Sequence, residues 1–148
     1  MAATIEEISS TTTGTKTVAS LARDWALITP GKVAMREKDF GIWQEYNWAQ
    51  TWDLIETAAH GLLATGIEVG DRVAIHSEDN PEWIILDLAT VAVRGITVGL
   101  YPTNPSAEVE YLVGDCTPKV YFAEDQEQAD KVLELSLIHI SEPTRLSV

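Results

Sequence analysis

The stretch 71–123 alternates short apolar runs with longer segments of helical spacing, and this alternation restricts the possible folds more than any other feature of the sequence. The apolar runs lie at 72–76, 96–100 and 119–123, and they are β-branched or aromatic in character, as strands are. Strand, helix, strand, helix, strand is the pattern of βαβ units, which build parallel sheets with right-handed crossovers. The sequence therefore predicts an α/β fold, with a parallel sheet and flanking helices.

A helix and a β-hairpin are expected before this sheet. Residues 18–26 place apolar side chains at the spacing of a short amphipathic helix. Two strand-like runs, 33–36 and 42–46, flank a charged segment that contains a glycine, which is typical of a hairpin. The aromatic residues Trp43, Tyr46 and Trp48 are expected to form one cluster that packs in the core.

The rest of the chain contains residues that typically begin and end helices. Asn47 and Gln50 have the spacing of a capping box, and Asn80 precedes a proline at the first helical position. Glycines follow the first two of these segments, where helices commonly end. Helices are accordingly predicted at 47–66, 80–95, 104–116 and from 125 onwards. The second of them carries so few polar side chains that burial on several sides is expected.

The acidic composition excludes some classes of partner. The chain has 23 acidic and 10 basic residues, which gives a net charge of -13. Such a surface disfavours binding to nucleic acids and to anionic lipid, and membrane association is left open. One cysteine permits no internal disulfide, and residues 1–10 lack the features of a secretory signal, so a cytoplasmic location is predicted.

No constellation of catalytic residues stands out. His60 and His76 have no obvious acidic partner, and His76 is expected to cap the core at a strand end. Cys116 lies on an apolar helix face without an activating base and is expected to be a core residue. The acids Asp71, Asp79 and Asp115 fall in different connections, so no metal site is predicted.

Three segments carry a family likeness: 34–48 (AMREKDFGIWQEYNW), 70–83 (GDRVAIHSEDNPEW) and 92–113 (AVRGITVGLYPTNPSAEVEYLV). In order and spacing they resemble the start of adenylate-forming, or AMP-binding, acyl-CoA synthetases. The strings MREKDFGIWQ and YPTNPSAEVEYLV are typical of bacterial long-chain fatty acyl-CoA ligases. The resemblance covers about residues 17–134 and implies the N-terminal part of the large domain of such an enzyme.

The resemblance implies an activity for a larger parent protein. Such ligases convert a fatty acid, ATP and CoA into acyl-CoA, AMP and pyrophosphate, with Mg²⁺ to offset phosphate charge. Their Ser/Thr/Gly-rich phosphate loop, acidic ATP motif and catalytic lysine are not found in this sequence. The stretch 11–16 (TTTGTK) has one glycine and follows no strand, so it is expected to be a mobile tail. No catalytic, cofactor-binding or metal residue is therefore assigned, and the fragment itself is expected to be inactive.

One loop remains a candidate for substrate contact. Ligands of parallel sheets gather beyond the carboxyl ends of the strands, where residues 101–105 are expected to lie. In some relatives the matching loop approaches CoA, which makes Tyr101 and Thr103 candidate contacts. The alternative is a helix-entry turn set by the two prolines of the loop.

The last stretch resembles laboratory sequence. A transposase-type sequencing adapter, read in frame, encodes LSLIHISEPTR, the residues at 135–145. Three regions are therefore expected: a flexible lead-in (1–16), a truncated synthetase portion (17–134) and an adapter-derived tail (135–148). His139 and Ser141 consequently receive no functional weight.

A non-catalytic alternative is a small standalone doubly wound α/β module that binds a partner or a phosphorylated ligand. The DNA beyond the codon of Glu134 would separate the two readings, because only the ligase needs a continuing frame with a phosphate loop. If the chain is truncated, open sheet edges and uncovered apolar faces should favour aggregation or partial folding of the isolated chain.

Overall fold

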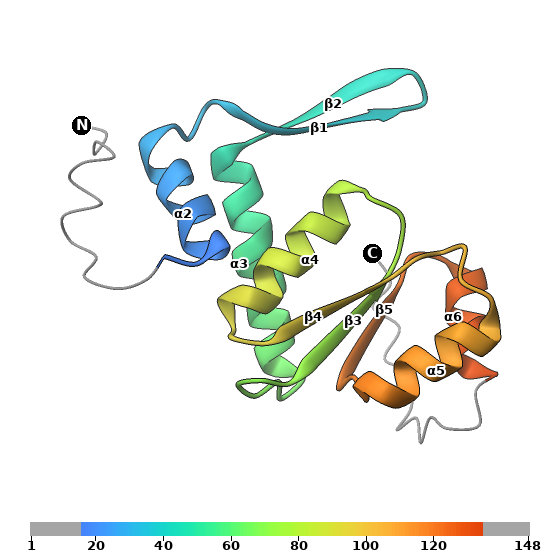
Figure 1. The fold of residues 1–148 in the computed structure, drawn as a ribbon. Helices are drawn as coiled ribbons and strands as arrows, with labels where there is room; N and C mark the ends of the chain where they lie inside the picture. Colours follow the sequence, from blue (N-terminus) through green and yellow to red (C-terminus); the bar gives the residue numbers. More distant parts are fainter. Residues whose placement is uncertain (1–15, 135–148) are drawn as a thin grey trace.

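A three-stranded parallel sheet forms the centre of the fold in the computed structural model, which describes residues 16–134 (Figure 1). Strand β3 (Arg72–His76) lies in the middle, with β4 (Ile96–Leu100) and β5 (Val120–Ala123) paired in parallel on either side. The predicted α/β class and parallel sheet are confirmed. Only the third strand differs in its bounds, because it begins one residue later than predicted.

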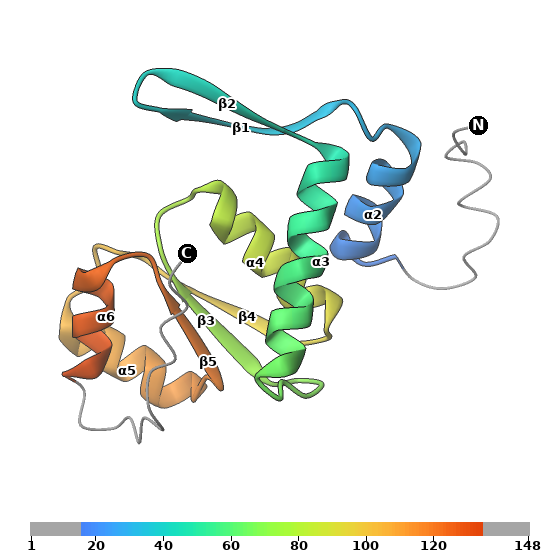
Figure 2. The same ribbon diagram turned by 180° about the vertical axis from the view of Figure 1, so that it is seen from behind.

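Helices cover both faces of this sheet (Figure 2). Helices α3 (Trp48–Ala64) and α4 (Pro81–Ala92) lie on one face, and α5 (Ser106–Cys116) and α6 (Gln126–Leu133) lie on the other. The order β3, α4, β4, α5, β5 is that of two consecutive βαβ units, as the alternation in the sequence predicted.

The central strand β3 supplies side chains to two hydrophobic clusters. Val73 and Ile75 belong to the cluster under α3 and α4, whereas Ala74 belongs to the cluster under α5 and α6. Successive strand residues point to opposite faces, so a strand covered on both sides reads as a continuous apolar run. This is why the short run at 72–76 could be recognised as a strand in the sequence.

The apolar helix α4 is covered within the described part of the chain. Ile85, Ala89 and Thr90 are buried, and the helix packs against α3, β4 and the first helix, α2 (Val18–Ile28). Ile84 keeps 44% of its surface exposed. Uncovered apolar faces were expected for a truncated chain, and on this helix such a face is small because α2 and α3 lie over it.

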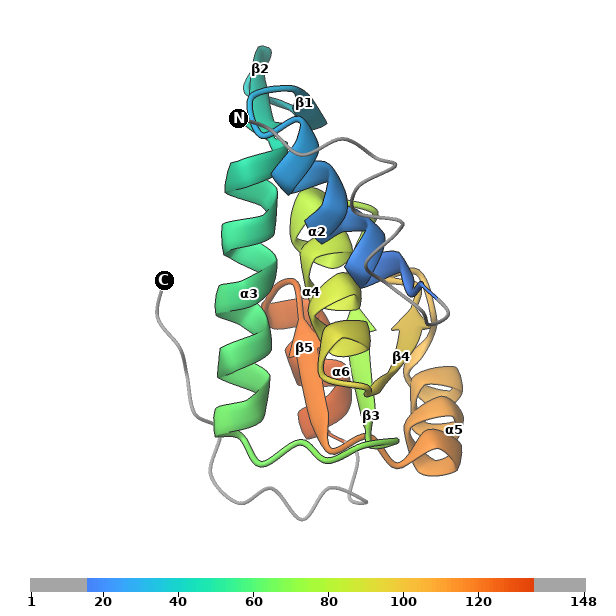
Figure 3. The same ribbon diagram turned by 90° about the vertical axis from the view of Figure 1, so that its left-hand side faces the viewer.

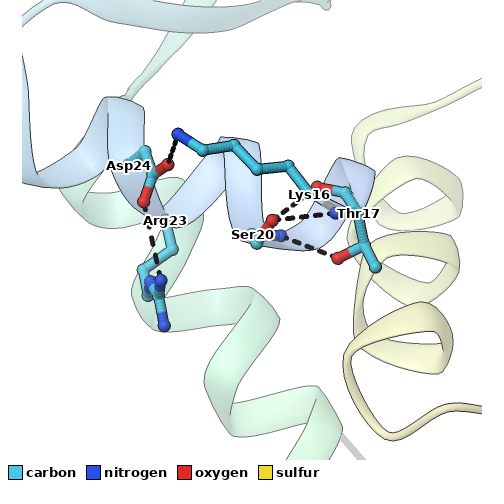
Figure 4. Close-up of polar contacts among 5 residues, drawn as sticks. All are labelled: Lys16, Thr17, Ser20, Arg23 and Asp24. Carbon is cyan, nitrogen blue, oxygen red and sulfur yellow. Dashed lines mark hydrogen bonds and ion pairs between the residues drawn. The ribbon is translucent and has the colours of Figure 1, made fainter. Parts of the chain in front are cut away.

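Helix α2 has a capping box at its start and, further along, a buried acid that is paired with a lysine (Figure 4). The Thr17 hydroxyl accepts a hydrogen bond from the Ser20 amide, and the Ser20 hydroxyl accepts one from the Thr17 amide. The carboxylate of Asp24 is 5% exposed and lies 2.8 Å from the ammonium of Lys16. Lys16 is the one described residue of the predicted lead-in; the others lie outside the described residues.

The hairpin before α3 is longer than predicted. Strands β1 (Val33–Asp39) and β2 (Ile42–Asn47) are antiparallel and extend away from the sheet as an arm (Figure 3). Both turn residues, Phe40 and Gly41, have positive φ angles, of 46° and 82°. Positive φ at both central positions is the geometry of a type I′ turn, whose twist matches that of the flanking strands.

The predicted cluster of Trp43, Tyr46 and Trp48 is wrong. Trp43 lies on the arm with 61% of its surface exposed, and the Lys38 ammonium lies 5.9 Å from its ring centroid. Trp48 instead stacks on Trp25 of α2, with ring centroids 6.1 Å apart. The outer part of the arm has no layer of helices over it, so Trp43 does not share a core with Trp48 at the start of α3.

The predicted helix caps are confirmed. The Asn47 side-chain oxygen accepts from the Gln50 amide at 2.8 Å, and the Gln50 side chain accepts from the Asn47 amide at 3.0 Å. The Asn80 side chain likewise accepts from the Trp83 amide at 2.8 Å. In α6, whose apolar side was expected to carry Ala129, Val132 and Leu133, Val132 is buried but Leu133 is 49% exposed, so that expectation is partly wrong.

Candidate functional site

The carboxyl edge of the sheet is the candidate functional site, because the ends of three parallel strands meet there. The connection 77–80 follows β3, the loop 101–105 follows β4, and Glu124 follows β5. The Glu124 carboxylate accepts hydrogen bonds from the Glu78 amide at 2.8 Å and from the Asn80 side chain at 3.3 Å. The loop before α4 is therefore tied to the end of β5.

His76 connects the end of β3 to β5 and to the loop after β4. It is the last residue of β3 and is 0% exposed. Its Nε2 lies 3.0 Å from the carbonyl oxygen of Tyr101, and its Nδ1 lies 2.6 Å from the hydroxyl of Tyr121. A carbonyl oxygen can only accept, so Nε2 carries the proton and Nδ1 accepts from the tyrosine hydroxyl.

The protonation of this pair follows from burial. Removal from water lowers the pKa of His76 from its ordinary value and raises that of Tyr121. Both shifts favour the neutral forms, which the hydrogen-bond pattern also requires. His76 therefore acts as a fixed hydrogen-bonding group, in agreement with the structural role predicted for it at a strand end.

The loop after β4 contains a turn with two anchored carbonyls. The carbonyl of Tyr101 accepts from the Asn104 amide at 2.9 Å as well as from His76, and the carbonyl of Pro102 accepts from Lys131 Nζ at 2.8 Å. Asn104 is buried, whereas the side chain of Tyr101 is 75% exposed. The turn thus has a fixed backbone and presents an aromatic ring to solvent.

Of the other singled-out residues, Asp79 lies at this edge, in the connection 77–80, and the rest lie away from it. His60 is exposed on α3, and Lys119 lies 2.9 Å from Asp71 before β3 and lowers the pKa of that carboxyl. Asp79 and Asp115 are exposed in separate elements. The fold keeps these groups apart, and their positions in different connections of the sequence had suggested this separation.

Cys116 has the environment of a structural cysteine. It is half-buried at the end of α5, and burial raises the pKa of its thiol. Within residues 16–134, no group of three His, Cys, Asp or Glu side chains is close enough to hold a metal ion. Over the same range, no helix combines the length and the apolar character needed to cross a bilayer.

Sequence reasoning missed the partners of His76. Tyr121 lies 45 residues further along the chain, and the carbonyl of Tyr101 lies 25 residues further. The available signal was the strand pattern itself, because a parallel arrangement brings the ends of all three strands to one edge. The pairing register of β3 and β5 was also needed to place His76 beside Tyr121, and the sequence pattern does not give that register.

The lowered pKa of His76 predicts a pH-dependent stability. Above the pKa of the unfolded chain, near 6.5, the imidazole is neutral in both the folded and the unfolded state. Its protonation then takes nothing from the free energy of unfolding. As the pH falls towards the folded pKa, the unfolded chain binds the proton first and the free energy of unfolding decreases. Urea unfolding monitored by tryptophan fluorescence should show this decrease as the pH is lowered below about 6.5.

A matched pair of variants tests the assignment to this side chain. His76→Gln should flatten the dependence over that range, whereas His60→Gln, at an exposed position of α3, should leave it unchanged. An equal slope in the wild type and in His76→Gln would contradict the prediction.

The comparison with known proteins begins with sequence. A long-chain-fatty-acid–CoA ligase of Mycobacterium bovis is 40% identical to this chain over 96 residues. The aligned stretch makes up 65% of this chain and 16% of that ligase, so the chain spans a small part of the relative's length.

Solved structures share the fold. The crystal structure of VinN matches with a TM-score of 0.76 and 20% identity, over 83% of this chain and 32% of that chain. The crystal structure of ATP-bound MatB from Rhodopseudomonas palustris matches with a TM-score of 0.58 and 29% identity, over 62% of this chain and 18% of that chain. At 20% identity, the match to VinN shows only that the two chains share a fold.

A family assignment follows from the sequence model described as "AMP-binding enzyme", which matches residues 22–146. This range covers most of the chain and contains the three segments on which the resemblance rests. It also runs through 135–145, which lies outside the described residues, so the adapter origin of that stretch stays a prediction. The chain belongs to the AMP-binding enzyme family.

Proposed function

We propose that this chain is part of an AMP-forming long-chain fatty acid–CoA ligase of lipid metabolism. The observation that carries the proposal is the 40% identity over 96 residues to the Mycobacterium bovis ligase. The reaction would join a fatty acid to ATP, release pyrophosphate, and transfer the acyl group to CoA with release of AMP. We also propose a cytoplasmic location, which the single cysteine suits, and no nucleic-acid partner, because the acidic charge disfavours one.

The chemistry explains what the described residues contribute. A carboxylate is a poor electrophile because its charge repels nucleophiles, and adenylation removes that charge and supplies a leaving group. In residues 16–134 the imidazole of His76 is buried, with Tyr121 and the Tyr101 carbonyl as its partners, and no three His, Cys, Asp or Glu side chains lie close enough together to hold a metal ion. The proposed contribution of these residues is a scaffold whose carboxyl edge borders the substrates. By itself this portion would not bind ATP or fatty acid productively.

A hybrid enzyme tests the proposal. Residues 17–134 would replace the matching segment of the Mycobacterium bovis ligase, and pyrophosphate release would be measured with fatty acid, ATP and CoA. We expect release that depends on the fatty acid, because the segment supplies the same strands and helices that the native one supplies. The matched control is the same hybrid with Ile55→Asp, which places a charge at a fully buried position and should abolish activity.

One outcome of the hybrid experiment would contradict the proposal. A hybrid that is folded, as judged by circular dichroism and by a monodisperse size-exclusion profile, but releases no pyrophosphate would contradict the ligase function. It would instead support the standalone α/β module.

The loop 101–105 provides a second prediction within the proposed function. Tyr101 and Thr103 are exposed in this loop at the carboxyl edge, and we propose that they lie near bound CoA. In the hybrid, Tyr101→Ala and Thr103→Ala should each raise the apparent KM for CoA and leave the KM for fatty acid unchanged. An unchanged KM for CoA in both variants would favour the simple helix-entry turn.

A further inference from the structure

The turn at 101–104 is held by side chains from two other elements. His76, at the end of β3, donates from Nε2 to the carbonyl of Tyr101, and Lys131 of α6 donates to the carbonyl of Pro102. The Tyr101 carbonyl also closes the turn by accepting from the Asn104 amide. Two successive carbonyls of the turn thus accept hydrogen bonds from side chains outside the loop. A turn whose role is only to start a helix does not need these additional bonds.

The opposite ring nitrogen has a partner that suits this donor, because the Tyr101 carbonyl requires the proton on Nε2 and a hydroxyl can donate to Nδ1. The Tyr121 hydroxyl donates to Nδ1 at 2.6 Å, and a neutral imidazole with an accepting Nδ1 must carry its proton on Nε2. The ring of Tyr121 also lies edge-on to that of His76, with centroids 6.0 Å apart, so the imidazole is fixed in orientation as well as in tautomer. The chain Tyr121–His76–Tyr101 therefore runs from β5 through β3 to the end of β4.

We propose that His76 is a positioning residue for the substrate-facing turn 101–104, and that it fixes the exposed side chains of Tyr101 and Thr103 through the Tyr101 carbonyl. The part of this proposal that concerns substrate rests on the proposed ligase function. The part that concerns the turn rests on the geometry alone. His76 acts through the backbone of the turn and touches no reacting atom.

The charges that face His76 do not supply an alternative role. Lys131 lies in the last turn of α6, and Asp125 and Glu127 lie at the start of that helix. Lys131 already donates to Pro102 and also pairs with Glu127 at 3.1 Å. None of these three groups is hydrogen-bonded to the ring of His76 among the described residues, so the ring is free to serve the turn and Tyr121 alone.

Amide hydrogen exchange on the full 148-residue chain tests the hold on the turn. The Asn104 amide donates to the same carbonyl as His76, so its exchange rate reports whether the turn opens. In His76→Leu we expect Asn104 to exchange about three- to tenfold faster relative to the amides of β3, the factor that corresponds to one net hydrogen bond. An unchanged relative rate would overturn the proposal.

Two further variants keep the test decisive if His76→Leu fails to fold. His76→Gln keeps an amide donor near the position of Nε2 and should retain most of the protection of Asn104, which a loss of packing alone would not restore. Tyr121→Phe removes the hydrogen-bond partner of Nδ1, which helps to orient the ring, and should give an intermediate rate. Equal acceleration in the Gln and Leu variants would show that packing, and not the donor, matters.

The hybrid ligase separates the two parts of the proposal. His76→Leu in the hybrid should raise the KM for CoA several-fold with a smaller change in kcat, and His76→Gln should restore it. A hybrid that is inactive with His76 intact would contradict the proposed function, whereas the exchange result would stand. An active hybrid whose KM for CoA does not respond to His76→Leu would overturn the positioning role for substrate.

Discussion

Replacement of Ile55 by alanine is expected to lower the free energy of unfolding by about 2–5 kcal/mol. Ile55 lies on α3, is 0% exposed, and belongs to the cluster that also contains Val73 and Ile75 of the central strand and Ile85 of α4. The substitution removes three carbon atoms from the place where α3, α4 and the sheet meet. A rigid core collapses only partly into such a gap, so a cavity term adds to the lost transfer free energy.

Leu54→Ala provides the matched control for this prediction. Leu54 precedes Ile55 on the same helix but is 41% exposed, so its truncation should cost well under about 1 kcal/mol. Pulse proteolysis in urea at low protein concentration measures both variants and limits association through exposed apolar side chains. Equal destabilisation by the two substitutions would mean that α3 is not packed as described.

The elements that follow local rules could be predicted from the sequence. The strands at 72–76 and 96–100 have the predicted bounds, because short apolar runs between turns leave few other solutions. The caps at Asn47 and Asn80 were predictable because a cap depends on residues within one helical turn. These features required no knowledge of what packs against what.

The features that depend on distant contacts could not be predicted in the same way. The stacking of Trp48 on Trp25 depends on how α2 lies against α3, which neither helix encodes alone. The candidate site shows the same limit more clearly, because the sequence placed the loop after β4 at the carboxyl edge but gave no reason to join Tyr101 to His76. Tertiary packing decides both contacts, and local propensity has no part in them.

Gly95 is a position where packing leaves no room for a side chain. It connects α4 to β4, and a Cβ atom there would lie 3.0 Å from the Thr90 methyl carbon and 3.3 Å from the carbonyl oxygens of Thr90 and Asp71. Thr90 is 0% exposed, and the Asp71 carbonyl accepts a hydrogen bond from the Ile96 amide at 2.8 Å, so none of these atoms can move freely. Gly95→Ala should therefore destabilise the protein by about 1–3 kcal/mol, as overpacking does.

The same substitution at Gly61 should have the opposite sign. Gly61 lies inside α3, where a Cβ atom would meet nothing within 4 Å. Alanine is the better helix former by about 0.5–1 kcal/mol, so Gly61→Ala should stabilise the protein by up to that amount. Urea midpoints of the two variants, compared with the wild type, give both signs in one experiment. If Gly95→Ala were as well tolerated as Gly61→Ala, the close approach of α4 to the start of β4 would be wrong, and with it the placement of β4 and of the turn that follows it.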